Sequence, residues 1–470
     1  MNKKLNLAVA GAVLAFGAAS AQAGIVIPAG EWTLDVSGNV NTFYSNTNFS
    51  GQLEQNTVTA TYAAYTAAGT TAVSAGAVTF TTNYSYKTVS GYQLTSRAAN
   101  GALTKSANEI STGLLPSAIG FGGKTRQNDI DVAFQTTFFV GANTASSGVG
   151  TFGNNNAGLN SLNIRQAFLT FGDKSWGQFK LGRDLGVFGS DAILSDMTLL
   201  GVGTGAGGAG SSTLGRIGSG YLYADWIGQI QYQSPNFSGF QVTGAMREPL
   251  GSSANHELGF EGKATFDFAA SDVTGRVWVG GIHQKTSTAA VAASSSILED
   301  TFGGASGVTA TRTWLYTAAS AASTKTSEAV EVGAKLSAAG FGLVGYYYDG
   351  KNIGTAGMIT PSVSASGLTF NTAAGDYDNK GGYVQGTFTI PNVGTKIGAS
   401  WGTSKIKAPT SASLNAEFEN ESWIVGAYHP LTKHLNLVAE YVDAEYTNIQ
   451  NYNGYNGKAR TGSLGAIMFF

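Results

Sequence analysis

The stretch HELGFEGKATFDF, residues 256–268, alternates apolar and polar side chains. One face would carry Leu258, Phe260, Ala264, Phe266 and Phe268, and the other Glu257, Glu261, Lys263, Thr265 and Asp267. Successive side chains of a β-strand point to opposite faces, so this period predicts a strand with one apolar face. A strand of a soluble sandwich would show the same alternation, so the stretch alone does not tell which solvent the apolar face meets.

Segments of this kind recur along the chain. Sixteen strands are expected, over residues 32–44, 116–124, 128–140, 163–172, 177–184, 223–233, 238–247, 256–268, 272–284, 327–337, 341–350, 380–390, 395–405, 420–429, 434–446 and 458–470. An even number returns both ends of the chain to one side, as bacterial outer-membrane barrels require.

Three observations favour a membrane barrel over a sandwich. Aromatic residues gather near strand ends, where they could form interfacial girdles: Trp32, Tyr44, Trp423, Tyr428, Tyr441 and Tyr446. Short turns near 172–177, 234–239, 338–341, 391–394 and 430–434 alternate with long connections over 45–115, 185–222, 285–326 and 351–379. The chain ends on a strand, GSLGAIMFF, with Leu464, Ala466, Met468 and Phe470 on one face. An extra hairpin is expected near residues 77–89, inside the first long connection.

The two ends and the composition agree with an exported membrane protein. Lys3 and Lys4 precede an apolar stretch that ends near Ala18, and small residues close with Ala21 and Ala23, which is the order of a signal peptide covering residues 1–23. Beyond residue 24 no window of 18 residues is wholly apolar, so a spanning helix is not expected. Hydrocarbon cannot satisfy free backbone groups, so strands that cross it must close into a barrel, here residues 24–470.

Charge and cysteine content exclude several classes of protein. The chain has 27 basic and 29 acidic residues, two of the basic ones in the leader, so nucleic acid is not an expected partner. There is no cysteine, so stability must come from packing and backbone pairing. No cluster of metal ligands is evident in the sequence, and neither a metal nor a cofactor is expected.

Fixed charges on the connection after residue 184 suggest an ion filter. In a narrow pore with low-dielectric walls, opposed basic and acidic walls would order water and sort ions. Asp184, Asp191 and Asp196 could supply one wall, and Arg165, Lys180 and Arg183 the other. The alternative is that these are solvated loop charges. Strand parity also places Arg183 with Phe179 and Leu181, so it would need a bulge to reach the lumen.

Three segments resemble the general porins of Gram-negative bacteria. NIRQAFLTFGDKSWGQFKLGRDLGVFGSDAILSDM, residues 163–197, is similar to their strand, turn and strand before the third loop. YQSPNFSGFQV, residues 232–242, and YHPLTKHLNLVAEY, residues 428–441, are similar to two of their later turns. The resemblance implies an all-β fold, a transmembrane antiparallel β-barrel of about 16 strands in the outer membrane. It also implies a homotrimer, with lipid and lipopolysaccharide around it and ions and small hydrophilic solutes passing through.

The resemblance further implies that the loop from Asp184 to about Tyr221 folds into the lumen. Arg165 and Arg183 match the basic side of the family's constriction, and Asp191 and Asp196 the acidic side. Three positions depart from the family pattern: Leu200 replaces an acid, and Ala118 and Asp225 replace basic residues. Ion preference therefore stays open, with weak cation selectivity or neutrality suggested by Asp225, unless the loop carries Arg216 inward.

Three other functions compete with a diffusion pore. A barrel enzyme would need a nucleophile beside a base, but His256, His283, His429 and His434 stand in no recognisable catalytic motif. A sugar- or carboxylate-selective channel could use Tyr346, Tyr347 and Tyr348, of which at most two can share the lumen. A surface adhesin is suggested by the Thr- and Ala-rich region 45–115.

Overall fold

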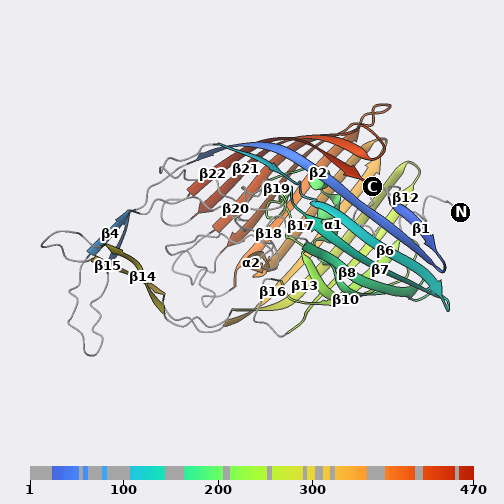
Figure 1. The fold of residues 1–470 in the computed structure, drawn as a ribbon, viewed down its shortest axis with the longest axis horizontal. Helices are drawn as coiled ribbons and strands as arrows, with labels where there is room; N and C mark the ends of the chain where they lie inside the picture. Colours follow the sequence, from blue (N-terminus) through green and yellow to red (C-terminus); the bar gives the residue numbers. More distant parts are fainter. Residues whose placement is uncertain are drawn as a thin grey trace.

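The chain forms one closed antiparallel β-barrel in the computed structural model (Figure 1). The structure describes residues 24–51, 57–61, 77–81, 106–142, 163–204, 212–250, 257–288, 294–301, 311–317, 323–356, 376–407, 417–449 and 455–470. The main sheet has 18 strands, of which β1 and β5 are short additions and sixteen make the wall. The predicted signal peptide, residues 1–23, lies outside the described residues.

The sixteen wall strands agree with the sixteen predicted ones. They are β2 (Trp32–Gly51), β6 (Ser117–Gln127), β7 (Ile130–Val140), β8 (Asn163–Asp173), β9 (Gly177–Leu185), β10 (Trp226–Gln233), β11 (Phe240–Arg247), β12 (Gly259–Ala270), β13 (Val273–Thr288), β16 (Ser323–Ala338), β17 (Phe341–Lys351), β18 (Asp378–Thr389), β19 (Lys396–Lys407), β20 (Glu417–Pro430), β21 (Leu435–Ile449) and β22 (Tyr455–Phe469).

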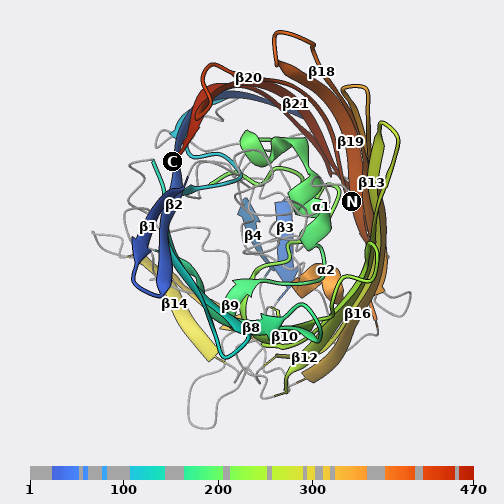
Figure 2. The same ribbon diagram turned by 90° about the vertical axis from the view of Figure 1, so that its right-hand side faces the viewer.

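The barrel closes where the first wall strand meets the last. β2 pairs with β22 from Asn39↔Phe469 to Gly51↔Gly457, and with β6 along its other edge. The amides of Gly38 and Phe470 exchange two further hydrogen bonds, of 2.8 and 3.1 Å. Figure 2, a view into the ring, shows the C-terminus beside β2. Closure leaves the wall without an unpaired edge, which hydrocarbon requires.

Side chains alternate between an outward apolar face and an inward face. In β13, Val277 and Val279 are 42% and 54% exposed, whereas Trp278 between them is 2% exposed. In β12 the outward Phe260 and Phe266 alternate with Glu261, Lys263 and Thr265, which confirms the face assignment made from residues 256–268. Outward apolar side chains facing lipid and polar ones facing inward are the pattern of a membrane barrel.

Tight turns join the strands at one end of the barrel. The five predicted turns all fall between consecutive paired strands. Two more lie at Asn128–Asp129 and Ser271–Asp272, each close to a three-residue gap between predicted strands that was not named as a turn. Asn128 and Asp129 both have positive φ, 48° and 61°, as a two-residue hairpin turn needs.

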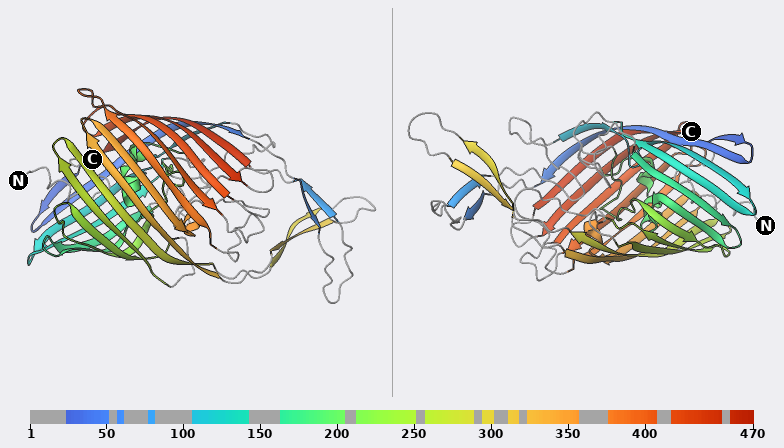
Figure 3. Two further views of the ribbon diagram at one scale, coloured as in Figure 1. Left: turned by 180° about the vertical axis from the view of Figure 1, so that it is seen from behind. Right: turned by 60° about the horizontal axis from the view of Figure 1, so that its bottom comes forward.

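Beyond the opposite end of the barrel, Figures 1 and 3 show small strands that belong to the long connections, β4, β14 and β15 among them. β5 (Ser106–Ser111) pairs with β2 and lengthens the wall, and β1 (Ile25–Ala29) pairs with β2 at its other end. The hairpin expected at 77–89 is instead a pair of β3 (Thr57–Thr61) with β4 (Ala77–Thr81), and residues 82–89 lie outside the described part. β14 (Ser294–Thr301) pairs with β15 (Thr311–Thr317), and α2 (Ile353–Ala356) follows β17.

The expected aromatic girdle holds in part. Trp423, Tyr441 and Tyr44 are 56%, 47% and 49% exposed on the outward face. Tyr428 is 2% exposed on the inward face, because it has the opposite parity to Trp423 on β20, so its assignment to the girdle was wrong. The side chain of Tyr446 lies outside the described part. None of the described helices has the length and apolar content to cross a bilayer.

Candidate functional site

Of the connection between β9 and β10, the structure describes residues 186–204 and 212–225, and its helix α1 lies within the ring of strands in Figure 2. The two ends of this connection are joined by a hydrogen bond in which the amide of Gly186 donates to the carbonyl oxygen of Asp225 at 2.9 Å. Glu261 on the inward face of β12 accepts from the amides of Val187 at 2.7 Å and Phe188 at 3.1 Å. Arg247 pairs with the same carboxylate at 3.0 Å, and both side chains are fully buried. A buried carboxylate with three donors turns the start of the loop inward.

The helix α1 (Ser190–Ser195) is clamped against the wall behind it. Gly189, with φ 78°, directs its amide to Glu331 of β16 at 2.9 Å. Asp191 accepts from Lys263 Nζ and from Arg276 at 3.0 Å. Burial alone would raise the pKa of Asp191, but the two cations lower it below its usual value. Asp191 therefore stays ionised and fastens α1 to β12 and β13.

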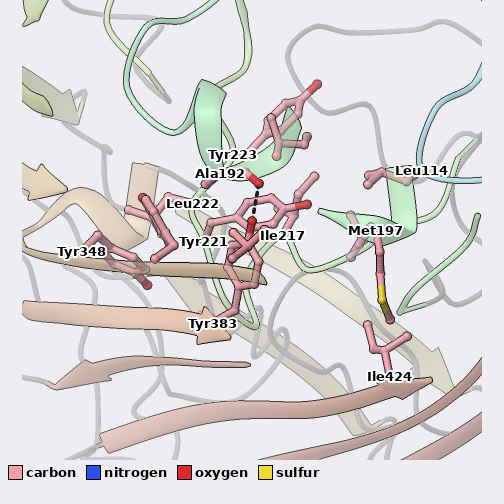
Figure 4. Close-up of a cluster of buried hydrophobic side chains, with 14 of the residues drawn as sticks. Leu114, Ala192, Met197, Ile217, Tyr221, Leu222, Tyr223, Tyr348, Tyr383 and Ile424 are labelled. Atoms are coloured by element: carbon pink, nitrogen blue, oxygen red, sulfur yellow. Dashed lines mark hydrogen bonds between the residues drawn. The ribbon is translucent and has the colours of Figure 1, made fainter. Parts of the chain in front are cut away.

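The next turn of the loop rests on β18. Gln385 accepts from Met197 N at 2.7 Å and donates to Ser195 O at 3.0 Å. Tyr383 donates to Ala192 O at 2.7 Å, and Figure 4 shows its ring beneath α1. Both side chains are buried and fix the loop, and Gln385 also borders the larger cavity described below.

Asp196 belongs to the internal structure of the loop. It accepts from Thr198 N at 2.9 Å, at the start of the short 3-10 helix Met197–Leu200, and from the hydroxyl of Tyr221 at 2.8 Å. Its carboxylate is therefore an N-cap and a loop cross-link, with both oxygens engaged.

The second half of the loop is tied to the last strands. Glu440 of β21 accepts from the amides of Val202 at 2.8 Å and Gly203 at 2.7 Å, and from Tyr428 at 2.6 Å. Arg216 of the loop is fully buried and donates to Ser400 and Ser422, so it does not project into open space. Three further hydrogen bonds hold the same part of the loop. Asn420 donates to the carbonyl oxygen of Gly218, the amide of Gly220 donates to Ser404, and the hydroxyl of Ser422 donates to that of Ser219.

The link between β5 and β6 meets the loop from the other wall. Leu114 N donates to Gly201 O at 2.9 Å, and Thr213 N donates to Gly113 O at 3.2 Å. Asn41 of β2 holds this link, accepting from Gly113 N at 2.9 Å and donating to Leu115 O at 2.8 Å. The loop is thus bonded to both sides of the barrel.

Two of the predicted basic and acidic residues neutralise each other on one strand. Lys180 and Asp184 face inward from β9 and form an ion pair of 2.5 Å, with Gln166 donating to Asp184 at 2.9 Å. They do not oppose each other across the lumen as expected. Asp191 and Asp196 are also engaged locally. The predicted arrangement of free acids facing free bases is therefore not what these residues form.

Arg165 and Arg183 lie in different environments. The pairing of β7 with β8 slips at Thr137/Phe138, and this bulge leaves Arg165 facing inward, 4.9 Å from the ring centroid of Phe139. Arg183 stands opposite Ala167 and Gly228, on the outward side that it shares with Phe179 and Leu181. The bulge that Arg183 would need falls on Arg165 instead, so Arg183 keeps the outward parity of its strand, while its guanidinium is still near enough to Asp225 to favour the ionised form of that carboxyl.

Asp225 closes the loop rather than facing the lumen openly. Its φ is 58°, and its carboxylate accepts from the amide of Trp226 at 2.7 Å. Burial raises its pKa. A partly desolvated carboxylate beside arginines gives little support to the cation preference suggested from the sequence.

Several inward cations were not assigned to the site from the sequence, although Lys263 was already placed on the polar face of its strand. Lys263 and Arg276 hold Asp191, Lys335 stands opposite Arg276 in the register of β13 and β16, and Lys396 lies 5.0 Å from the ring centroid of Tyr428. Strand parity could have found them, because each falls on the polar face of its own segment. The three tyrosines behave as parity predicts: Tyr346 and Tyr348 are buried inward, and Tyr347 is 46% exposed outward.

Two cavities adjoin the loop. The wider one, about 480 Å³, holds Lys335, Lys396, Asp196 and Asp272 along its wall. The smaller one, about 50 Å³, is lined mainly by apolar side chains, together with Arg165, Ser212 and Thr213. Leu115, Leu194 and Leu199 line both. Among the described residues, no group of His, Asp and Glu side chains could hold a metal ion.

Comparisons with known proteins agree with this geometry. The structure is similar to the outer-membrane channel DcaP of Acinetobacter baumannii, with 13% identity and a TM-score of 0.55, covering 95% of this chain and 100% of that one. It is also similar to a loop L8 deletion mutant of OmpT, an outer-membrane protein of Vibrio cholerae, with 13% identity and a TM-score of 0.50, covering 94% and 100%. None of the curated proteins matches the chain. The family model described as Gram-negative porin matches residues 8–449, so the chain belongs to the Gram-negative porin family.

Proposed function

We propose that this porin forms a water-filled channel through which ions and small hydrophilic solutes cross the outer membrane by passive diffusion, and that loop 186–225 sets its width. The observation that carries this proposal is the row of inward acceptors, Glu261, Glu331, Gln385 and Glu440, that bind the loop backbone from four different strands. A loop held this way has a fixed position in the lumen.

The physical reason lies in the backbone of the loop. Amide groups buried inside a barrel must find partners, and a loop of irregular structure cannot supply all of them itself. The wall supplies carboxylates and amides at the matching heights, so the loop stays folded in the lumen instead of extending into solvent. The outward apolar face of the strands places the same barrel in hydrocarbon.

The proposal includes the surroundings of the barrel. Residues 1–23 act as a signal peptide, the mature chain assembles as a homotrimer, and lipid and lipopolysaccharide contact its outward face. Crosslinking of the protein in mild detergent tests the trimer. Membership of the porin family favours a channel over an enzyme or an adhesin, and hydrolytic activity is not expected.

Reconstitution into planar bilayers tests the channel. Purified, folded protein should add conductance in discrete steps, and the current should rise linearly with voltage and with salt concentration. A control preparation, unfolded by boiling, should add none. Folded barrels that insert into the bilayer but pass no current would overturn the proposal.

A further inference from the structure

A furrow of about 450 Å³ crosses the outward face of strands β16 to β20. Its floor is made of small residues on neighbouring strands: Ala334 on β16, Gly345 on β17, Gly386 on β18 and Ala399 on β19. A Cβ at Gly345 would have nothing within 4 Å, so the layer of large side chains that covers the wall elsewhere is missing here. The floor therefore consists of backbone and methyl groups.

Large apolar side chains stand around this floor. Leu343, Val384 and Trp423 each project outward and are 56% exposed. Trp401 packs beside Trp423, with 6.3 Å between the ring centroids. In the register of the sheet, Gly345 lies in one row with Val384, Trp401 and Trp423. The furrow is therefore a hollow between tall apolar side chains, and its walls come from several strands.

The furrow lies within the apolar band, toward the end of the barrel that carries the long connections. Beyond Trp401 in that direction, the next outward residues of β19 are Thr403 and Lys405, and Lys405 pairs with Glu419 of β20 at 2.8 Å. Toward the short turns the outward face stays apolar at Ile397 and Val425, which are 44% and 47% exposed. Paired tryptophans next to a polar row are typical of the boundary between hydrocarbon and headgroups.

A hollow at this depth must be filled by hydrocarbon. Atoms that line an empty space lose their dispersion contacts, so a void is unfavourable. Water does not fill an apolar space, because a confined water molecule needs several polar partners. The backbone of the floor already pairs within the sheet, as Gly345 does with Ala334 and Val384. The furrow is continuous with the outward apolar face, so a lipid chain can enter it from the side.

We propose that this furrow binds one acyl chain of a membrane lipid from the leaflet nearer the long connections. The chain lies on the small-residue floor and packs against Leu343, Val384 and Trp423. The polar row above it contains both signs of charge, in Lys405 and Glu419, so the site selects the chain rather than the charge of the headgroup. This inference rests on the proposed function, because it assigns one lipid contact to the same membrane-embedded barrel.

Native mass spectrometry measures whether the lipid is retained. Folded, delipidated protein in mild detergent is incubated with dipalmitoyl phosphatidylcholine or with dipalmitoyl phosphatidylglycerol, and the micelle is then removed by collisional activation. The two probes have the same chains and differ in headgroup charge. Wild-type protein should retain either lipid, because the furrow holds a chain that both of them carry.

Two substitutions fill the furrow without touching the lumen. Gly345→Leu and Ala399→Leu each place a branched side chain on the floor, and each should lower the retention of both lipids several-fold. Gly244→Leu on β11 is the matched control, because Gly244 is also outward, with nothing within 4 Å of its Cβ position, and does not line the furrow. It should retain lipid as the wild-type protein does. Heat-dependent gel mobility of each variant checks that the barrel is folded.

The outcomes separate this inference from the proposed function. Single-channel conductance should be the same in all three variants as in the wild-type protein, and its absence from the wild-type protein contradicts the channel and not the furrow. Retention that both furrow substitutions leave unchanged overturns the inference, as does retention of phosphatidylglycerol alone, which would indicate a site for charge. Loss of the crosslinked oligomer in Gly345→Leu also overturns it, because a second copy of the chain would then occupy the furrow.

Discussion

Glu440 shows how one side chain can hold the loop. Three donors reach its buried carboxylate: two loop amides and the hydroxyl of Tyr428. Both loop amides reach Oε2, so a glutamine oxygen can still accept from them while its NH₂ group donates to the Tyr428 oxygen, but the negative charge is lost. A hydrogen bond to a charged group contributes about 1.5–3 kcal/mol and a neutral one about 0.5–1.5 kcal/mol, so we expect Glu440→Gln to loosen residues 201–204 from β21 and to give larger, noisier single-channel currents.

The matched control for this change is Glu445→Gln on the same strand. Glu445 points outward and pairs with Lys458 at 2.7 Å, with both side chains 39% exposed. An exposed pair of this kind contributes little, so its currents should match those of the wild-type protein. Equal currents from both variants would show that Glu440 does not anchor the loop.

Asp191 decides how much positive charge the wall presents. It binds Lys263 and Arg276, and Arg276 also pairs with Asp267 at 2.6 Å. Asp191→Asn should therefore free Lys263, leave Arg276 paired with Asp267, and increase anion selectivity, read from the zero-current potential in a salt gradient. Because its pKa is lowered on folding, its ionised form contributes stability above the pKa of the unfolded chain, and this is lost as the pH falls through the folded value. Selectivity that stays the same in Asp191→Asn would contradict this role.

At the scale of elements, the link between β5 and β6 packs so closely against the loop that a single added methyl group at Gly113 should disturb the contact. A Cβ at Gly113 would lie 2.1 Å from the carbonyl oxygen of Gly201 and 2.8 Å from the ring of Phe43. We expect Gly113→Ala to push the loop away from this wall, to change single-channel conductance and to lower stability by about 1–3 kcal/mol. Gly244→Ala is the control, since nothing lies within 4 Å of its Cβ position.

The strands could be predicted from the sequence because each depends on local alternation. Residues 256–268 specify their own inward and outward faces, and a strand with one face in lipid cannot shift by one residue without reversing them. Most of the short turns were also predictable, because a Gly or a Pro in the sequence marks each of the five that were named. The turn at Ser271–Asp272 has neither residue in that position, so it was missed. β5 was missed because it interrupts a low-complexity region.

At the scale of the whole molecule, the charges of the site could be found in the sequence but their partners could not. Asp191 meets Lys263 and Arg276 across separations of 72 and 85 residues. No local pattern specifies which strand a folded-in loop will touch, so free charges were expected where the structure has ion pairs. The inward position of Arg165 depends on a bulge in the pairing of two strands, which parity counted along one strand does not reveal.

The fixed position of the loop can be tested directly, because the chain contains no cysteine. The hydroxyls of Ser219 in the loop and Ser422 on β20 are 3.1 Å apart, so Ser219→Cys/Ser422→Cys should form a disulfide of about 2.05 Å with small adjustments. Ser45 and Ser463, 2.8 Å apart at the seam of β2 and β22, provide the positive control for oxidation. If the loop already rests against β20 in the open channel, oxidised and reduced protein should conduct equally. Failure to crosslink while the seam pair oxidises, or a change in conductance on reduction, would mean that the loop moves in the working channel.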